Sequence, residues 1–213
     1  KRDMENGKKL VLITIKGTQT DMEIVLDCTV DPVSTFGAAW HGGFSRACRT
    51  VYEDLYQYLG NDLSNTVFVV TGHSLGAGVA NLLELTLSNN GVAKENVYGY
   101  NFACPDVATA TPFDWNPNGD HDNMFNISHA GDPISILPGV IGDTTISILN
   151  IFSQWGKFGQ SYWFASNWSN LSELTVVSMD HHLPAQYLSF LNTELGSKLK
   201  LHMELRAELR FMI

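Results

Sequence analysis

Short apolar runs alternate with helically spaced apolar positions along most of the chain. The run from Leu10 to Ile15 is almost continuously apolar, as expected of a central strand buried on both faces. Further runs of this kind are Thr66 to Thr71, Val97 to Phe102, Met124 to Ser128 and Leu174 to Val177. Between the first two runs, apolar residues recur at helical spacing from Ala47 through Val51 to Leu55, which predicts a helix.

Two further segments have helical patterns. One lies between Val79 and Leu87, and the other extends roughly from Ala185 to Leu195. Strands that alternate with helices in this way predict an α/β fold with a mainly parallel sheet. The length of 213 residues fits one domain, which we place at residues 1–197. Residues 198–213 fit an edge strand, a helix or added sequence equally well, and we assign them no role.

Composition and charge exclude some classes of function. The formal net charge of −9 argues against nucleic acid as a partner and against electrostatic binding to anionic membranes. No apolar run reaches the roughly 18 to 20 residues that a transmembrane segment needs. Among the three cysteines, Cys28 and Cys48 can form one disulfide, and three buried thiols that include Cys104 explain the pattern equally well.

The cellular location stays open at this stage. The chain begins at Lys1 and contains no signal-like apolar segment, so we expect a processed or trimmed product. The sequence is compatible with a secreted protein and with a cytoplasmic one. Asn126, Asn167 and Asn170 each begin a glycosylation pattern, which matters only in a eukaryotic secretory route.

The densest chemical signal follows the second apolar run. Gly72-His73-Ser74-Leu75-Gly76 fits the pattern G-x-S-x-G, with a predicted strand before it and a predicted helix after it. Such a sharp turn lifts the serine hydroxyl out of the sheet, and its glycines let the strand and the helix approach closely. Ser74 is therefore a candidate nucleophile.

A serine nucleophile needs a base that takes its proton and an acid that orients the base. In hydrolases with this elbow, the acid and then the histidine follow the serine along the chain. Asp132 and His182 each lie just past a predicted strand, so both can meet Ser74 at the carboxyl edge of the sheet. His181 remains an alternative base, and Asp106 remains an alternative acid.

Two backbone amides can form an oxyanion hole. The N–H of Leu75 lies at the start of the helix, where the helix dipole adds to its effect. Gly17-Thr18 directly follows the first strand, so the N–H and hydroxyl of Thr18 can join Leu75. Because the chain has no H-x-x-x-H or H-E-x-x-H pattern, we expect neither a metal nor another cofactor.

Six short motifs follow one another in a recognisable order. They are Gly17-Thr18, His41-Gly42-x-Phe44, Thr71 to Ala77, Cys104-Pro105, Asp132-Pro133-x-x-x-Leu137-Pro138 and His182-x-x-x-x-Tyr187. From about Leu10 to Leu195 the chain thus resembles the class 3 lipases, which are fungal-type lipases with plant and bacterial relatives. The resemblance implies an α/β-hydrolase fold, a mainly parallel central sheet flanked by helices in a single domain. It also implies that Ser74 is the nucleophile, Asp132 the orienting acid and His182 the base, with Thr18 and Leu75 as oxyanion donors.

The segment between the candidate acid and base is unusually apolar. From Ile134 to Phe164 it collects bulky aromatic residues between glycines, which suits a flap or an acyl-binding wall over the site. Trp155 and Phe158 are therefore candidate substrate-binding residues. A core helix and strand would explain much of the same pattern, and both interpretations stay open.

These patterns together predict a serine carboxylic-ester hydrolase of lipase type. Its expected partner is an acylglycerol or a related lipid ester, bound at a lipid–water interface and cleaved through an acyl-enzyme on Ser74. A phospholipase A1 and a short-chain or feruloyl-type esterase are alternatives, since they use the same triad. A catalytically idle module that binds lipid or protein is a remote alternative, and ester turnover across chain lengths distinguishes all of these.

Overall fold

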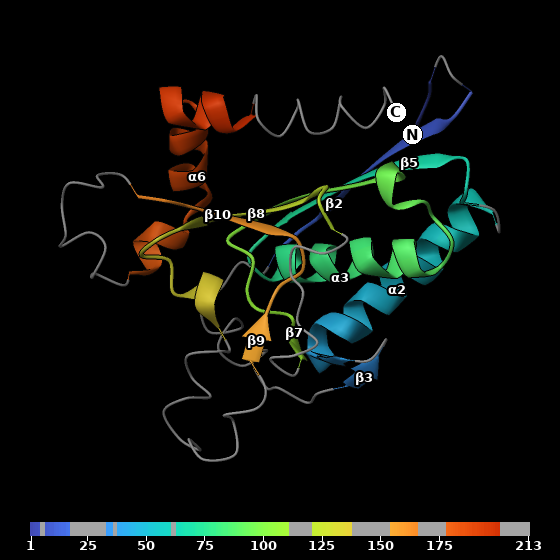
Figure 1. Cartoon of the computed structure of the whole chain (residues 1–213), viewed down its shortest axis with the longest axis horizontal. Helices are drawn as coiled ribbons and strands as arrows, with labels where there is room; N and C mark the ends of the chain where they lie inside the picture. The colour runs from blue at the N-terminus through green and yellow to red at the C-terminus, as the bar shows by residue number, and fades with distance from the viewer. Residues whose placement is uncertain are drawn as a thin grey trace.

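A six-stranded sheet forms the centre of the molecule (Figure 1). The computed structural model describes residues 1–4, 7–17, 33–35, 38–60, 63–110, 121–137, 154–165 and 178–200. Within these residues the strands lie in the order β1 (Arg2–Asp3), β2 (Lys9–Ile15), β5 (Thr66–His73), β6 (Val97–Phe102), β8 (Met124–His129) and β10 (Gln160–Phe164). Only β1 runs antiparallel to its neighbour, and all other neighbouring strands are parallel.

Helices cover both faces of this sheet. The long helices are α2 (Gly42–Leu59), α3 (Leu75–Asn89) and α6 (Pro184–Leu191), and the short 3₁₀ turns are η1 (Lys94–Asn96), η2 (Ile134–Ile136) and η4 (Met179–His182). In Figure 1, α3 lies beneath the sheet with α2 below it, and α6 lies on the other side, at the end of β8 and β10. No helix among the described residues is long and apolar enough to cross a membrane.

A second, smaller sheet lies beyond α2 and α3 in the view of Figure 1. Its four antiparallel strands, in the order of the sheet, are β3 (Val33–Thr35), β4 (Ala38–Trp40), β7 (Ala108–Ala110) and β9 (Gln154–Gly156). Strands of three residues are too short to show a periodic pattern, so the sequence did not predict them.

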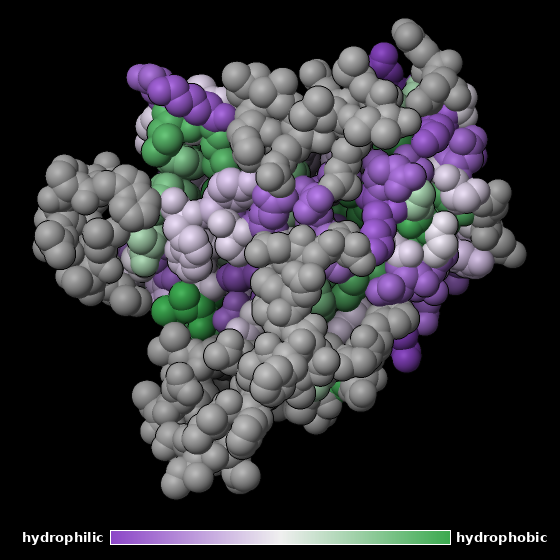
Figure 2. Space-filling model, in the orientation of Figure 1, coloured by the Kyte–Doolittle hydropathy of each residue, from purple (hydrophilic) through white to green (hydrophobic). Residues whose placement is uncertain are grey.

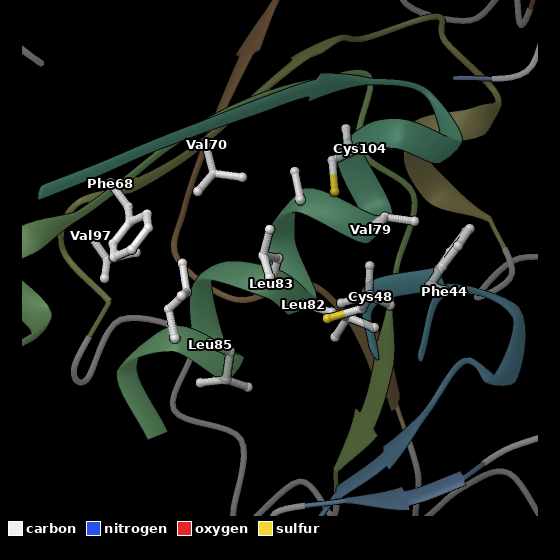
Figure 3. Packing of buried hydrophobic residues seen from close by; sticks show 14 of the residues in the cluster. Phe44, Cys48, Phe68, Val70, Val79, Leu82, Leu83, Leu85, Val97 and Cys104 are labelled. Atoms are coloured by element: carbon white, nitrogen blue, oxygen red, sulfur yellow. The ribbon is translucent and has the colours of Figure 1, made fainter. Parts of the chain in front are cut away.

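The main core fills the space between the sheet and the two helices α2 and α3 (Figure 3). Phe68 and Val70 of β5 are completely buried and face α3, where Leu82 and Leu83 are also completely buried. From the other side, Cys48 of α2 packs into the same cluster. Because α3 is enclosed by the sheet and by α2, it is apolar nearly all round rather than along one stripe.

A second cluster joins α6 to the β8–β10 end of the sheet. Phe125, Ile127 and Phe164 of the strands pack there against Tyr187 of α6. Further along the chain, Leu188 and Leu195 are largely exposed. In Figure 2, hydrophobic surface is visible near the α6 end of the molecule, whereas much of the remaining described surface is hydrophilic.

The α/β prediction is confirmed, with four of the predicted strands present as β2, β5, β6 and β8. The predicted strand at 174–177 lies outside the described residues. On its outer side β8 pairs with β10, which comes from the apolar stretch expected to overhang the site, and Phe164 of β10 is buried in the second cluster. Residues 194–200 are helical, and Leu199 packs against the second cluster. This helix crosses residue 197, where we expected the domain to end. The domain boundary stays a prediction.

The described cysteines carry free thiols. Cys48 and Cys104 are both free and buried, whereas Cys28 lies outside the described residues. Burial raises the pKa of Cys48 to about 11 and that of Cys104 to about 12. The interpretation as buried thiols is therefore correct for these two residues.

The register of the parallel strands brings their carboxyl ends to one edge. Ile15 at the end of β2 pairs with Gly72 near the end of β5, and His73 pairs with Phe102 at the end of β6. At the far end of the sheet, the last residues of β8 and β10 also pair. Loops that leave these strands therefore start side by side, which is where sites form in parallel α/β sheets.

Candidate active site

Ser74 occupies a strained turn between β5 and α3. Its backbone has φ 60° and ψ −133°, and positive φ values are uncommon for residues other than glycine. The Ser74 N–H donates a hydrogen bond of 3.0 Å to the carbonyl of Phe102, which ties the turn to the end of β6. This conformation is the one expected of a nucleophile elbow.

The two glycines of the elbow are required by close backbone approach. A Cβ atom on Gly72 would overlap the backbone of Gly76 and Ala77. A Cβ atom on Gly76 would overlap the carbonyl of Ile15 and approach the amide of Gly17. The elbow therefore packs directly against the carboxyl end of β2, where the candidate oxyanion loop begins.

His182 links Ser74 to Asp132 at the end of the short turn η4. Its Nε2 lies 2.8 Å from Ser74 Oγ, and its Nδ1 lies 3.0 Å from each carboxylate oxygen of Asp132. A carboxylate only accepts hydrogen bonds, so Nδ1 carries the proton and Nε2 is left to accept the serine O–H. All three residues are at most 6% exposed.

Asp132 receives two further hydrogen bonds. The amide of Ile134 donates to Oδ1 at 2.9 Å, and the hydroxyl of Tyr187 donates to Oδ2 at 2.5 Å. Burial by itself would raise the pKa of Asp132, but the hydrogen bond and charge of His182, together with these two donors, lower it below its ordinary value. The carboxylate is therefore ionised and fixed in orientation at neutral pH.

The alternative residues from the sequence lie elsewhere. His181 stacks on His129 with ring centroids 4.2 Å apart, and Asp106 forms an ion pair with Lys157. His73 donates from Nε2 to the carbonyl of His182 at 2.9 Å, so it fixes the backbone of the residue that faces Ser74. Burial and the neighbouring His182 lower the pKa of His73, in keeping with a neutral ring.

Only part of the expected oxyanion hole lies within the described residues. Leu75 is the first residue of α3, so its amide stands at the positive end of the helix dipole, directly after Ser74. Thr18 lies outside the described residues, but its neighbour Gly17 is described. A Cβ atom on Gly17 would lie 3.2 Å from the Cβ of Ser74, so the loop starts in contact with the elbow.

The candidate substrate-binding residues lie on and just after β9. Trp155 belongs to the small sheet, and its ring meets His41 edge-on at a centroid distance of 6.3 Å. Phe158 is partly buried against the main core, with its ring 6.5 Å from that of Trp40. Whether either side chain contacts a substrate stays a prediction.

A cavity of about 420 Å³ opens at the carboxyl ends of β2 and β5. Its lining includes Gly17, His73, Phe102 and Pro184. His73 directly precedes Ser74 and Pro184 follows two residues after His182, so the cavity lies near the candidate site although neither Ser74 nor His182 lines it.

Sequence reasoning assigned no role to three groups near the candidate acid, which are Tyr187, Ile134 and Lys157. Tyr187 was noticed only through its spacing from His182, and that spacing was the available signal for its role. The amide of Ile134 and the ammonium of Lys157 left no signal, because a backbone amide is present at almost every position and a single lysine in an apolar stretch has no distinctive pattern.

Comparison with known proteins assigns the family. The family model described as lipase (class 3) matches residues 12–141, which is more than half of the chain. Two similar curated relatives are the secreted mono- and diacylglycerol lipases A of Penicillium cyclopium and Penicillium camembertii. Each is 28% identical over 141 residues, which are 63% of this chain and 45% of the relative. The chain thus spans less than half the length of these relatives.

Solved structures agree with the fold. The lipase from Rhizopus microsporus var. chinensis superposes with a TM-score of 0.58 at 20% identity, over 76% of this chain and 55% of that one. A mutant form of MDLA from Penicillium cyclopium gives a TM-score of 0.56 at 22% identity, over 82% of this chain and 63% of that one. Together with the observed parallel sheet and strained elbow, these likenesses establish the α/β-hydrolase fold. The chain belongs to the class 3 lipase family.

Proposed function

We propose that this protein is a serine carboxylic-ester hydrolase of lipase type that cleaves acylglycerols or related lipid esters through an acyl-enzyme on Ser74. The observation that carries the proposal is the continuous chain of hydrogen bonds from Ser74 Oγ through His182 to Asp132. A buried serine that donates to a histidine held by a carboxylate is the arrangement that activates a hydroxyl at neutral pH.

The first half of the reaction forms the acyl-enzyme. As Ser74 Oγ attacks the ester carbonyl carbon, its proton passes to His182 Nε2, and Asp132 stabilises the imidazolium that results. The carbonyl oxygen becomes an oxyanion, which the Leu75 amide at the start of α3 stabilises, with Thr18 as the proposed second donor. His182 then returns the proton to the departing alcohol oxygen as the carbon–oxygen bond breaks.

The second half releases the acid. A water molecule takes the place of the alcohol, gives a proton to His182 Nε2 and attacks the acyl carbon. The second oxyanion collapses, the bond to Ser74 Oγ breaks, and His182 reprotonates the serine. The strained φ of Ser74 supports both halves, because it keeps Oγ directed out of the sheet throughout.

Family membership and the named activities of the relatives support a lipid ester as substrate. The two Penicillium relatives are named as secreted lipases of mono- and diacylglycerols. We therefore place the substrate at a lipid–water interface and the protein outside the cell. We propose that the cavity of about 420 Å³ at the carboxyl ends of β2 and β5, which His73 and Pro184 line, receives one arm of such an ester.

A panel of p-nitrophenyl esters tests this function. We expect turnover that rises with acyl chain length and falls by about 10⁶-fold, to background, in Ser74→Ala. A fluorophosphonate should label Ser74 in the parent protein and leave Ser74→Ala unlabelled, and circular dichroism should show equal folding of both. A maximum at short chains would instead identify an esterase. A parent protein with neither turnover nor labelling would refute the proposal.

A further inference from the structure

A buried lysine forms a hydrogen bond with the turn that follows Asp132. Lys157, in the turn between β9 and β10, is only 8% exposed. Its ammonium donates to the carbonyl of Cys104 at 2.5 Å and to the carbonyl of Ser135 at 2.6 Å. It also forms an ion pair of 3.4 Å with Asp106 Oδ1. An ammonium group has three N–H donors, so the three acceptors match all of them.

The turn that carries Lys157 is itself held rigidly. Asn81 of α3 exchanges two hydrogen bonds with the backbone of Phe158, at 3.0 Å and 2.9 Å. Asn126 of β8 donates to the same carbonyl at 2.7 Å. All three of these hydrogen bonds are partly buried, so the backbone of Phe158, the residue next to Lys157, is fixed. The ammonium therefore reaches its acceptors from a defined position.

One acceptor of this ammonium, the carbonyl of Ser135, belongs to the loop that presents Asp132, and the other two belong to the Cys104–Asp106 segment. Ser135 lies in η2, next to Ile134, whose amide donates to Asp132 Oδ1. The same loop ends at Leu137, whose carbonyl accepts a hydrogen bond of 2.7 Å from the Asp106 amide. Through Ser135, Lys157 restrains the short turn that sets the direction of the Ile134 amide, and with it one oxygen of the Asp132 carboxylate.

We propose that Lys157 is a positioning residue for Asp132, in which a buried ammonium holds the η2 turn against the Cys104–Asp106 segment. This role rests on the proposed function, since it concerns the acid of that triad. Among the described residues, Lys157 forms no hydrogen bond or ion pair with Ser74, Asp132 or His182, so we place its effect on the turn rather than on the substrate.

A simple removal of Lys157 would confuse two effects. It would free the η2 turn, and it would also leave the Asp106 carboxylate buried without its cation, which destabilises the fold. Burial raises the pKa of Asp106 even though the charge of Lys157 opposes that rise, so an amide of the same size avoids the cost of burying this carboxylate. Asp106→Asn therefore removes the charge of the partner while the two carbonyl acceptors of Lys157 remain.

The decisive comparison is Lys157→Met/Asp106→Asn against Asp106→Asn alone. We expect the double variant to unfold at the same or a higher midpoint than Asp106→Asn, because the single variant leaves the Lys157 ammonium buried without its counter-ion and the double variant removes that charge. Asp106→Asn should keep the kcat and KM of the parent. The double variant should lose about 10- to 100-fold in kcat with KM within about twofold, as expected when a catalytic group is misplaced by a fraction of an ångström to an ångström. Its acidic limb of kcat/KM should also move to lower pH, since a displaced carboxylate stabilises the imidazolium less.

Two additional measurements keep the role of Lys157 testable if the double variant unfolds or the parent is inactive. Lys157→Arg keeps the charge pair but places its donors differently, so it should fold and still lose kcat. The proton NMR resonance of the His182 Nδ1–H reports its hydrogen bond to Asp132 without any substrate, and it should shift in the double variant but not in Asp106→Asn. The positioning role would be overturned if the folded double variant had the kcat, the pH profile and the His182 resonance of the parent. If only Lys157→Arg folds, the same result in that variant would overturn it. Absence of turnover and labelling in the parent would refute the proposed function instead.

Discussion

Replacing Tyr187 by phenylalanine tests the electrostatics of the triad with a minimal change of shape. The Tyr187 hydroxyl donates to Asp132 Oδ2 at 2.5 Å and accepts a hydrogen bond of 3.2 Å from the backbone amide of His129. Burial, and then the charge of Asp132, raise the pKa of Tyr187, so the hydroxyl stays protonated and acts as the donor. The ring packs edge-on against Phe164 at 5.3 Å, and phenylalanine preserves that packing.

The expected loss of stability follows from the two bonds. A hydrogen bond to a charged group contributes about 1.5 to 3 kcal/mol, and a buried amide left without a partner costs about 1 to 3 kcal/mol. Asp132 keeps the donors Ile134 and His182, so part of the first loss is recovered by the remaining bonds. We therefore expect Tyr187→Phe to lower the free energy of unfolding by about 2 to 4 kcal/mol at pH 7.

The pH dependence separates the carboxylate bond from the amide bond. The pKa of Asp132 is lowered in the folded protein, so its ionised form adds stability that is present above the unfolded value of about 3.9 and disappears as pH falls through the folded pKa. Without the Tyr187 hydroxyl the folded pKa rises, and this contribution shrinks. The stability difference between parent and variant should consequently be larger at pH 7 than below about pH 4.

Urea unfolding at pH 7 and pH 3 measures this difference, and steady-state kinetics measure the effect on turnover. We expect kcat to fall about tenfold, which corresponds to about 1.4 kcal/mol of transition-state stabilisation, with KM unchanged. Tyr58→Phe is the matched control, because Tyr58 is 67% exposed on α2 and should change neither quantity. A stability difference that is independent of pH, together with parent-like kcat, would show that the hydroxyl does not stabilise the carboxylate.

Three further substitutions test the elbow, the acid and the core. Gly76→Ala would place a methyl group on the carbonyl of Ile15, so fluorophosphonate labelling of the serine should slow at least about 100-fold; labelling at the parent rate would contradict the packing. Asp132→Asn should keep the thermal midpoint within a few degrees yet lower kcat about 10⁴-fold, as expected when the histidine loses the partner that fixes its tautomer. Burial raises the pKa of Glu84 in the folded protein, so the carboxyl ionises less readily there than in the unfolded chain. Above the pKa of about 4.3 that glutamate has in the unfolded chain, the free energy of unfolding of the parent should therefore fall by up to about 1.4 kcal/mol per pH unit. Glu84→Gln should remove this slope, and equal slopes in urea unfolding from pH 5 to pH 8 would refute the burial of an uncharged carboxyl.

The parts of the fold that the sequence predicted well are those with long runs or regular repeats of apolar residues. β5 is a continuous apolar run because both of its faces are covered over much of its length. The similar run in β2 is not buried on both faces, since Leu12 is 66% exposed, so that expectation is wrong for β2. α2 shows its buried stripe directly as recurring apolar positions. The glycines that flank Ser74 predicted the elbow, because a side chain at either position would overlap backbone atoms where the strand and the helix meet.

The parts that the sequence did not predict depend on contacts between distant segments. β10 was read as part of a flap because bulky aromatics between glycines suit a flap and a strand alike, and only the pairing of Phe164 with His129 distinguishes them. The small sheet is built from strands of three residues each. Lys157 binds backbone carbonyls, which every residue possesses, so no sequence pattern marks its partners.

The two arms of the triad consequently differ in what holds them. Ser74 is fixed by local geometry, since the strand, the glycines and the helix that position it are neighbours in sequence. Asp132 also has a local donor, the Ile134 amide, but it depends in addition on distant groups: Tyr187 of α6 donates to it, and Lys157 is proposed to restrain the η2 turn from between β9 and β10. Loss of α6 packing would therefore misalign the acid while the elbow kept its shape. Partial unfolding should accordingly abolish rapid turnover before it abolishes the strained conformation of Ser74. The position of Asp132 is therefore more sensitive to loss of the native fold than the position of Ser74.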